Sequence, residues 1–428
     1  MALTLLHTAD WHIGRIQNAT GGISYDRLSD QEEALKKLLE LVEEHDPQLI
    51  LVAGDLYDTP RPRSEAERLI AEYLPRLTRA GRRLLVAIAG NHDSRPAFAT
   101  YHNWARPLGI LLIGTIQDTL LYDGKTAGED HALSAPLPGV LRIQLRDVLY
   151  PLYLYAFPHL HNSQWPQAYE IPPSDPEKNP EKISYPEAWH MIPERFIRQE
   201  PGAYHIFMGH SFCVAQVSEE AGDAPDDEES FRAGGDERHG MEVFHPKLHY
   251  VALGHLHRPH QVGKGPIYYP GSLLWYGPHH TDTPRQVILA QWEKPQSPPQ
   301  ISFHKLSLES FQPLVLETDR IFDVNDLLSQ VPAPRRALWL RWKGPSHLST
   351  KTIQDLTENY YLFYRYLPPA TLTSSPASGT EAADPQYLLR EPDELLERFL
   401  RHKRWPDEDI QKAILCIFKK YAHITQET

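Results

Sequence analysis

Oxygen and nitrogen donor side chains follow the ends of five separate apolar segments of this sequence. They are Asp10, His12, Asp55, Asn91, His210, His255 and His257. None is a thiol, and such donors bind divalent cations of hard to intermediate character. One histidine in a loop is more often a surface residue than a ligand. Because five segment ends deliver the same kind of side chain, we interpret the set as metal ligands.

The number of donors fits a two-metal site. Two divalent ions about 3.5–4 Å apart need roughly seven protein donors with one bridging carboxylate, and together they orient a water and clamp the oxygens of a phosphoryl group. His92 is not needed as a ligand, so we expect it to act as a general acid for the leaving oxygen or to stabilise the transition state as a cation. Asp93 is expected to orient His92.

A small residue precedes the first donor at each segment end. These residues are Ala9, Gly54, Gly90, Gly209 and Gly254. Glycine permits a sharp turn of the backbone. We therefore expect these glycines to let the main chain approach a bound ion or phosphate closely.

The elements that must position the donors alternate between strands and helices. Strands are predicted over 2–10, 47–55 and 82–93, and amphipathic helices over 31–44 and 64–79. The strands are continuously apolar, which predicts a parallel sheet covered on both faces. In such a sheet, ligands bind at the carboxyl ends of the strands, where the donors lie.

Further strands are predicted later in the chain, over 149–158, 203–210, 248–255 and 266–272. The segment 159–200 is rich in Pro, His and Trp and is expected to be irregular. Ser64 and Glu67 have the spacing of a capping box, which predicts that Ser64 caps the helix that follows it.

Composition indicates a soluble globular protein of 428 residues with a net charge of −13. The acidic balance argues against a protein whose main work is passive binding to a polyanion, but not against an enzyme that acts on phosphodiesters with bound cations. No apolar stretch approaches the ~20 residues needed to cross a bilayer. The N-terminus reads as a strand rather than a signal peptide, so we expect a cytoplasmic protein without a membrane segment. Cys213 and Cys416 are interpreted as packed thiols.

Five motifs occur in a fixed order: "DWH", "GDLYD", "GNHD", "GH" and "GHLH". As a set they resemble the calcineurin-like metallophosphoesterase superfamily. Within it, "HTADWHIGR", "GDLYDTPRP", "GNHDS", "YVALGHLHRPHQV" and "YYPGS" are most similar to SbcD-type nuclease subunits, the bacterial relatives of the Mre nucleases. The resemblance covers about residues 1–300 well and the remainder only in outline.

The resemblance implies an α/β fold, a sandwich of mixed sheets flanked by helices. It implies a first metal held by Asp10, His12, Asp55 and His257, and a second held by Asp55, Asn91, His210 and His255. His92 would be the catalytic histidine and Asp58 would support the site. Mn²⁺ is the metal expected, although sites of histidine and carboxylate also accept Fe or Zn. The implied reaction is hydrolysis of DNA, by exonuclease action on double strands and endonuclease action on single strands and hairpins.

Among the arginines near the ligand motifs are Arg15, Arg61, Arg95 and Arg258. The forked donors of arginine suit phosphate, so these residues are candidates to bind the substrate backbone. A solvated loop arginine is an equally good interpretation of each one taken alone.

Composition changes after the predicted nuclease domain, 1–300. Strands are expected within 301–317 and 336–344, and a helix over 323–330, so that 301–370 forms a small α+β unit. By resemblance, this unit is a capping domain that selects DNA ends.

A linker of Ser, Thr, Pro and Ala follows over 371–385, and 386–428 carries two amphipathic helical stripes. These stripes either pack back on the chain or dock on a partner. The resemblance favours docking on the coiled coil of an SbcC-like ABC ATPase, and it implies a homodimer of the nuclease subunit.

Two other functions stay open at this point. The chain could be another phosphoesterase of the superfamily that acts on nucleotides, phosphoproteins or lipids, or a scaffold that metal stabilises without turnover. The presence of His92 argues against a scaffold, since a scaffold needs no general acid.

Overall fold

The computed structural model describes residues 2–18, 24–171, 179–215, 238–277, 283–308, 313–318, 336–342 and 346–366. Backbone contacts divide the chain into a unit Met1–Leu367 and a unit Pro368–Thr428. All described residues belong to the first unit. The predicted linker 371–385, the tail 386–428 and the helix 323–330 lie outside the described residues.

The first sheet has six strands, in the order β20-β19-β1-β4-β5-β6. Its parallel part consists of β1 (Leu3–Thr8), β4 (Leu49–Ala53), β5 (Leu84–Ile88) and β6 (Ile110–Ile113). β19 (Gln286–Trp292) joins β1 in antiparallel pairing, and β20 (Gln300–Lys305) joins β19. The three strands predicted at the start of the chain are β1, β4 and β5. A domain boundary was predicted between residues 300 and 301. β20 crosses it and pairs with β19, so residues 301–305 belong to the first sheet.

The later predicted strands form a second sheet of eight strands rather than extending the first. Its order is β17 (His260–Gln261), β18 (Ile267–Tyr269), β16 (Tyr250–Gly254), β13 (Tyr204–His210), β10 (Leu152–Phe157), β9 (Val140–Gln144), β8 (His131–Leu137) and β7 (Thr126–Ala127). β10, β13, β16 and β18 are parallel neighbours. β9 and β17 pair antiparallel with β10 and β18, so the sheet is mixed.

Alternate residues of each strand face different cores, which explains why the strands are apolar on both sides. Leu5 and Leu51 of the first sheet pack in one cluster with Leu154 and Ile206 of the second, so the two sheets lie face to face. Leu6 instead shares a cluster with residues of the helices α1 (Leu28–His45), α2 (Ser64–Leu77) and α3 (Arg95–Ala105).

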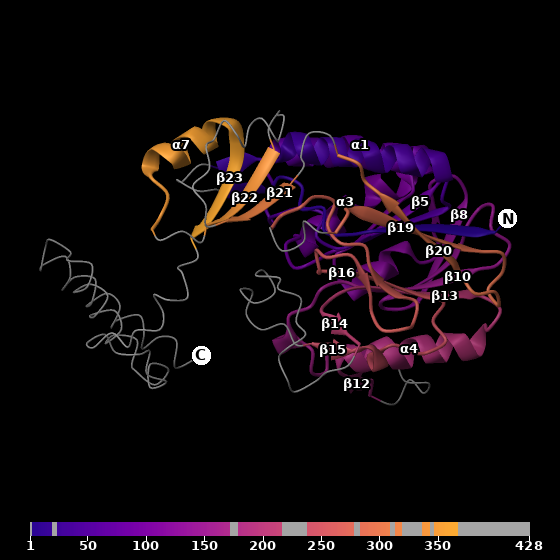
Figure 1. The fold of residues 1–428 in the computed structure, drawn as a ribbon. Coiled ribbons are helices and arrows are strands. Elements are labelled where there is room, and N and C mark those ends of the chain that lie inside the picture. The colour runs from indigo at the N-terminus through magenta and orange to yellow at the C-terminus, as the bar shows by residue number, and fades with distance from the viewer. Residues whose placement is uncertain are drawn as a thin grey trace, which may run out of the picture. The chain divides into compact units, whose positions relative to one another are not determined.

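Helix α4 (Tyr185–Gln199) covers the outer face of the second sheet, and Figure 1 shows α1 and α4 on opposite sides of the two sheets. The four layers are helix, sheet, sheet and helix. They confirm the expected α/β sandwich of mixed sheets flanked by helices.

Two local predictions are wrong. α4 occupies part of the segment 159–200 that was expected to be irregular, and Ser184 with Glu187 forms its capping box. In α2 the capping residue is Arg63, and the Ser64 hydroxyl contacts the Glu65 carboxylate instead of capping the helix.

Smaller elements complete the described structure. β21 (Pro313–Thr318), β22 (Arg336–Trp342) and β23 (Tyr360–Tyr366) form a parallel sheet, with α7 (Thr350–Asn359) before β23. The two-stranded sheets are β2 (Ile16–Asn18) with β3 (Ser24–Asp26), β11 (Tyr169–Ile171) with β12 (Glu181–Ile183), and β14 (Cys213–Val214) with β15 (His239–Gly240). Among the described helices, none is long and apolar enough to span a membrane.

Candidate metal centre

The predicted donors come from the carboxyl ends of strands in both sheets. Asp10 and His12 follow β1, Asp55 follows β4 and Asn91 follows β5 of the first sheet. His210 ends β13, and His255 and His257 follow β16, in the second sheet. Because the sheets pack face to face, a site between these strand ends receives donors from both.

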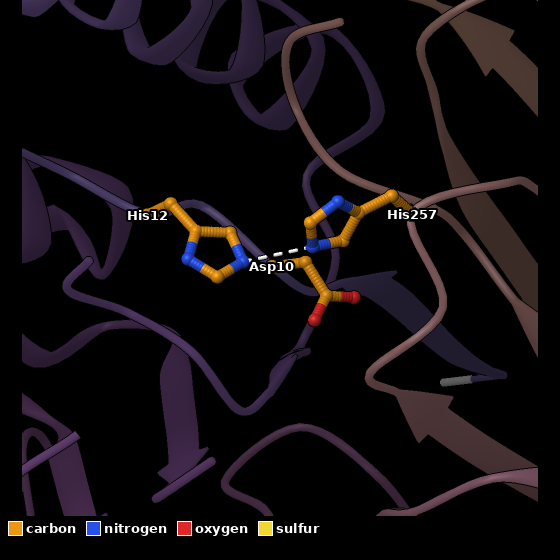
Figure 2. Close-up of side chains that lie close together, drawn as sticks. All are labelled: Asp10, His12 and His257. Carbon is orange, nitrogen blue, oxygen red and sulfur yellow. Dashed lines mark hydrogen bonds between the residues drawn. The ribbon is translucent and has the colours of Figure 1, made fainter. Parts of the chain in front are cut away.

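One group joins Asp10, His12 and His257, with one donor atom of each lying within 4.8 Å of the others. The Nε2 atoms of His12 and His257 are 2.9 Å apart, and Figure 2 shows these two rings facing each other beside the Asp10 carboxylate. All three residues are buried. Their lone pairs therefore converge on one small volume.

A second group forms around Asn91. Its Oδ1 lies 2.9 Å from His210 Nε2 and 3.2 Å from His255 Nδ1. The main-chain N–H of His255 donates to Asp10 Oδ1 at 2.9 Å, which connects this group to the first. Six of the seven predicted donors thus form one continuous cluster.

Asp55 lies between the two groups. Its Oδ2 is 3.6 Å from His12 Nε2 and 3.4 Å from His210 Nε2, while its Oδ1 accepts a hydrogen bond from the main-chain N–H of His92. Burial disfavours the charge of both Asp55 and His210, but their mutual attraction prevails. It keeps the pKa of Asp55 well below its usual range and raises the pKa of His210 to about 9. A divalent cation at this point would take the place of the imidazole proton.

Four of the donor residues have left-handed backbone conformations that non-glycine residues rarely adopt. The φ angles are 52° at Asp10, 47° at His12, 53° at Asp55 and 101° at His255. Such conformations cost about 1–3 kcal/mol each and persist where the surrounding structure imposes them, often at functional sites. These strained conformations occur directly after β1, β4 and β16, where the chain enters the cluster.

The glycines beside the donors make room for donors from other strands. A Cβ on Gly90 would lie 2.0 Å from Asp55 Oδ1, and one on Gly54, whose φ is +92°, would lie 2.1 Å from His210 Nδ1. The main chain at these glycines therefore approaches donor side chains from other strands, whereas the sequence led us to expect an approach to a bound ion or phosphate.

His92 lies beside the first group, with its ring centroid 4.7 Å from that of His12. Its Nδ1 is 2.7 Å from the carbonyl oxygen of Asp58. The Asp93 carboxylate instead accepts main-chain hydrogen bonds from Leu56, Tyr57 and Gly90. The Asp58 carbonyl therefore orients the His92 ring, a role that was expected of Asp93. Asp93 instead connects the loop after β4 to the loop after β5.

The burial of Asp93, together with the nearby charge of Asp55, raises the pKa of its carboxyl to about 6.

The Asp58 carboxylate lies 3.5 Å from His12 Nδ1 and 3.4 Å from Arg15 Nη1. Asp58 therefore contacts a donor residue from behind, as a supporting residue would.

The four candidate arginines differ in their surroundings. Arg15 contacts Asp58 and lies over the ring of Tyr276, 4.8 Å from its centroid. Arg61 is exposed in the loop before α2, and Arg95, at the start of α3, and Arg258, directly after His257, are partly exposed. The structure thus connects Arg15 to the donor cluster through Asp58, and the other three lie near the motifs in sequence.

Two positioning residues were not identified from the sequence. The Tyr276 ring meets the rings of His12 and His257 edge to face, with centroids 5.5 and 5.8 Å away, and its hydroxyl donates to the carbonyl of Trp11. Arg285 is buried and donates to the carbonyl of His257 at 2.8 Å. Neither residue carries a local pattern that distinguishes it, because each reaches the site only through the fold.

The donor set fits divalent cations. The seven donor side chains supply imidazole, carboxylate and amide atoms that can coordinate a cation, and three overlapping groups of histidine and aspartate residues lie in the described structure. Asp55 belongs to two of these groups, as Asp10 and His12 also do, and His92 belongs to one.

Comparison with known proteins agrees with this chemistry. The family model for calcineurin-like phosphoesterases matches residues 3–259. The D subunit of the nuclease SbcCD from Bacillus subtilis is 28% identical over 316 residues, which are 73% of this chain and 71% of the relative. Its counterpart from Rhodobacter capsulatus is 30% identical over 277 residues, 63% of this chain and 62% of the relative. The crystal structure of TT1561 of Thermus thermophilus covers 72% of this chain at 11% identity, with a TM-score of 0.35. The family and relative matches confirm the resemblance inferred from the motifs.

Proposed function

Since this chain belongs to the calcineurin-like phosphoesterase family, we propose that it is a metal-dependent DNA nuclease. It would cut double strands as an exonuclease and single strands or hairpins as an endonuclease. The observation that carries the proposal is the Asp55 carboxylate, which lies between His12 of one donor group and His210 of the other. The names of the two relatives, both nuclease subunits, support DNA as the substrate.

We assign the first cation to Asp10, His12, Asp55 and His257, and the second to Asp55, Asn91, His210 and His255. Two bound cations, which we propose to be Mn²⁺, would supply an activated water and neutralise charge on the phosphate. The fold holds the donors in place, because left-handed turns fix the backbone at four of them and the missing Cβ atoms of Gly54 and Gly90 leave room for the side chains of His210 and Asp55.

His92 is proposed to protonate the leaving oxygen. Its Nδ1–H donates to the Asp58 carbonyl, so its Nε2 is the atom that exchanges a proton with substrate. Arg15, Arg61, Arg95 and Arg258 are proposed to bind phosphates of the DNA backbone. Arg15 would act with its guanidinium fixed by Asp58 and Tyr276.

The test is a cleavage assay on linear double-stranded and hairpin DNA with Mn²⁺, Mg²⁺ or EDTA. We expect cleavage with Mn²⁺, none with EDTA, and a loss of about 10²–10⁴-fold in His92→Gln with Mn²⁺ binding retained. If the wild-type protein cleaves no DNA but hydrolyses a small phosphodiester, the chain is a phosphoesterase with another substrate. If it binds Mn²⁺ and hydrolyses neither, it is a scaffold.

We further propose that the tail 386–428 docks on an SbcC-like coiled-coil ATPase, that the part of 301–370 beyond β20 caps the site, and that the nuclease subunit forms a homodimer. An amphipathic pair of helices on a polar linker must bury its apolar stripes, and a partner groove is one place to do so. Deleting 386–428 should abolish co-purification with the ATPase and leave Mn²⁺-dependent cleavage of simple substrates intact. Retained co-purification would contradict the docking proposal.

A further inference from the structure

A further histidine lies at the rim of the donor cluster. His159 follows β10, which is the parallel neighbour of β13, and Phe157 of β10 is paired with Gly209, the residue before His210. The ring centroid of His159 lies 6.0 Å from that of His210 and 6.5 Å from that of His255. The end of β10 therefore brings an imidazole to the second donor group, as β13 and β16 do.

The main chain around His159 is fixed by three successive hydrogen bonds. The N–H of His159 donates to the carbonyl of Ala89 at 2.9 Å, next to Gly90 and Asn91. The Tyr185 hydroxyl donates to the carbonyl of Pro158, and the Trp165 indole N–H donates to that of Leu160. Both aromatic side chains are buried. A loop histidine held in this way is preorganised beside the cluster rather than free to turn into solvent.

Geometry separates His159 from the donor residues themselves. Ring centroids are 4.8 Å apart for His12 and His257 and 5.2 Å apart for His210 and His255, closer than either contact of His159. His159 is absent from the donor groups found among the described residues. His210 is buried whereas His159 is partly exposed, so His159 lies at the rim of the cluster.

His92 and His159 flank the cluster near different donors. The His92 ring lies beside His12, and the His159 ring beside His210 and His255. A phosphodiester that spans both donor groups would meet one histidine near each of them. His92 is the one proposed to exchange a proton, which leaves a binding role for the other.

We propose that His159 is a substrate-contacting residue whose ring N–H donates a hydrogen bond to a non-bridging phosphate oxygen beside the second donor group. A neutral imidazole always carries one N–H, so the contact requires no change of protonation. The inference rests on the proposed function only to the extent that the site binds a phosphate ester.

The experiment compares full-length wild type with His159→Phe, which keeps a ring without an N–H, and His159→Gln, which keeps a donor. His161→Ala is the matched control, because His161 lies two positions further along the same loop and is exposed. With Mn²⁺ present, we measure inorganic phosphate binding by calorimetry, hydrolysis of bis(p-nitrophenyl) phosphate, and the number of Mn²⁺ ions bound.

We expect His159→Phe to weaken phosphate binding and raise KM about tenfold, with a smaller effect on kcat, because a charged hydrogen bond is lost. His159→Gln should recover most of the affinity, and His161→Ala should match wild type. Mn²⁺ stoichiometry should be the same in all variants. Unchanged phosphate affinity in His159→Phe, or loss of a Mn²⁺ ion from it, overturns the inference. Wild type that hydrolyses the small diester but not DNA contradicts the nuclease proposal and leaves this test valid.

Discussion

The Nε2 atoms of His12 and His257 lie 2.9 Å apart, although 245 positions separate the two residues in the chain. Both rings are buried, and Tyr276 packs against each of them. Two neutral imidazoles can share this contact only if one Nε2 carries a hydrogen. A cation between them would accept both lone pairs, so metal binding and the stability of this cluster are linked.

Mn²⁺ should therefore raise the thermal unfolding midpoint, by an amount equivalent to about 2.7 kcal/mol at a hundredfold excess over Kd. EDTA should reverse the rise. His257→Ala should bind fewer Mn²⁺ ions and show a smaller rise, as measured by calorimetry and thermal unfolding. His260→Ala is the control, since its ring stacks on Tyr269 instead. Wild-type Mn²⁺ binding by His257→Ala would contradict the assignment.

The shared position of Asp55 predicts that Asp55→Asn is more harmful than Asp58→Asn. Asp55 contacts the donors His12 and His210 directly, whereas the Asp58 carboxylate contacts the donor His12 from behind. We expect Asp55→Asn to lose at least one Mn²⁺ ion and nearly all hydrolysis. Asp58→Asn should lose about 10–100-fold in metal affinity or activity, as residues that orient ligands do. Metal titration and diester hydrolysis measure both effects, and equal losses would argue against a shared carboxylate.

Gly90→Ala should weaken Mn²⁺ binding without altering any donor. The new Cβ would lie 2.0 Å from Asp55 Oδ1, so the carboxylate must move. We expect at least about a tenfold loss of Mn²⁺ affinity, since misplaced ligands bind metal poorly. Gly202→Ala is the control, because nothing lies within 4 Å of its Cβ. If both variants bind Mn²⁺ like wild type, Gly90 is not needed for ligand placement.

His205, far along β13 from the cluster, predicts acid sensitivity. Burial lowers its pKa from 6.5 to about 4, and its Nδ1 is 2.8 Å from the Tyr155 hydroxyl. The unfolded chain binds the proton more readily, so stability from this residue is present above pH 6.5 and is lost as pH falls toward 4. The loss at pH 5 should be on the order of 2 kcal/mol.

Denaturant unfolding between pH 7.5 and 5 measures this loss. His205→Gln should flatten the pH dependence of the free energy of unfolding. Tyr155→Phe, which keeps the imidazole, should destabilise the protein yet retain the slope. An unchanged slope in His205→Gln would show that other groups cause the acid sensitivity.

Local patterns were enough to single out the seven side chains that cluster and the strands that carry them. A continuous apolar run followed by Asp, Asn or His is visible in the sequence, and β1, β4, β5, β10, β13 and β16 lie within the predicted strands. The helix α4 was missed although its capping box, Ser184 with Glu187, has a local pattern. The high Pro and Trp content of 159–200 led to the prediction of an irregular segment in spite of this capping box.

The sequence by itself determined which side chains are available and that they follow strand ends, because both are properties of neighbouring residues. Only the tertiary structure decided that the strands divide into two sheets and that Asp55 meets both His12 and His210. In the structure, Asp93 accepts hydrogen bonds from the main chain of a neighbouring loop instead of contacting His92 as expected. The fold also places Tyr276, Arg285 and His159 beside the cluster. The physical reason is that strand pairing and the contacts between loops depend on residues far apart in the chain, and no local periodicity encodes which of them meet.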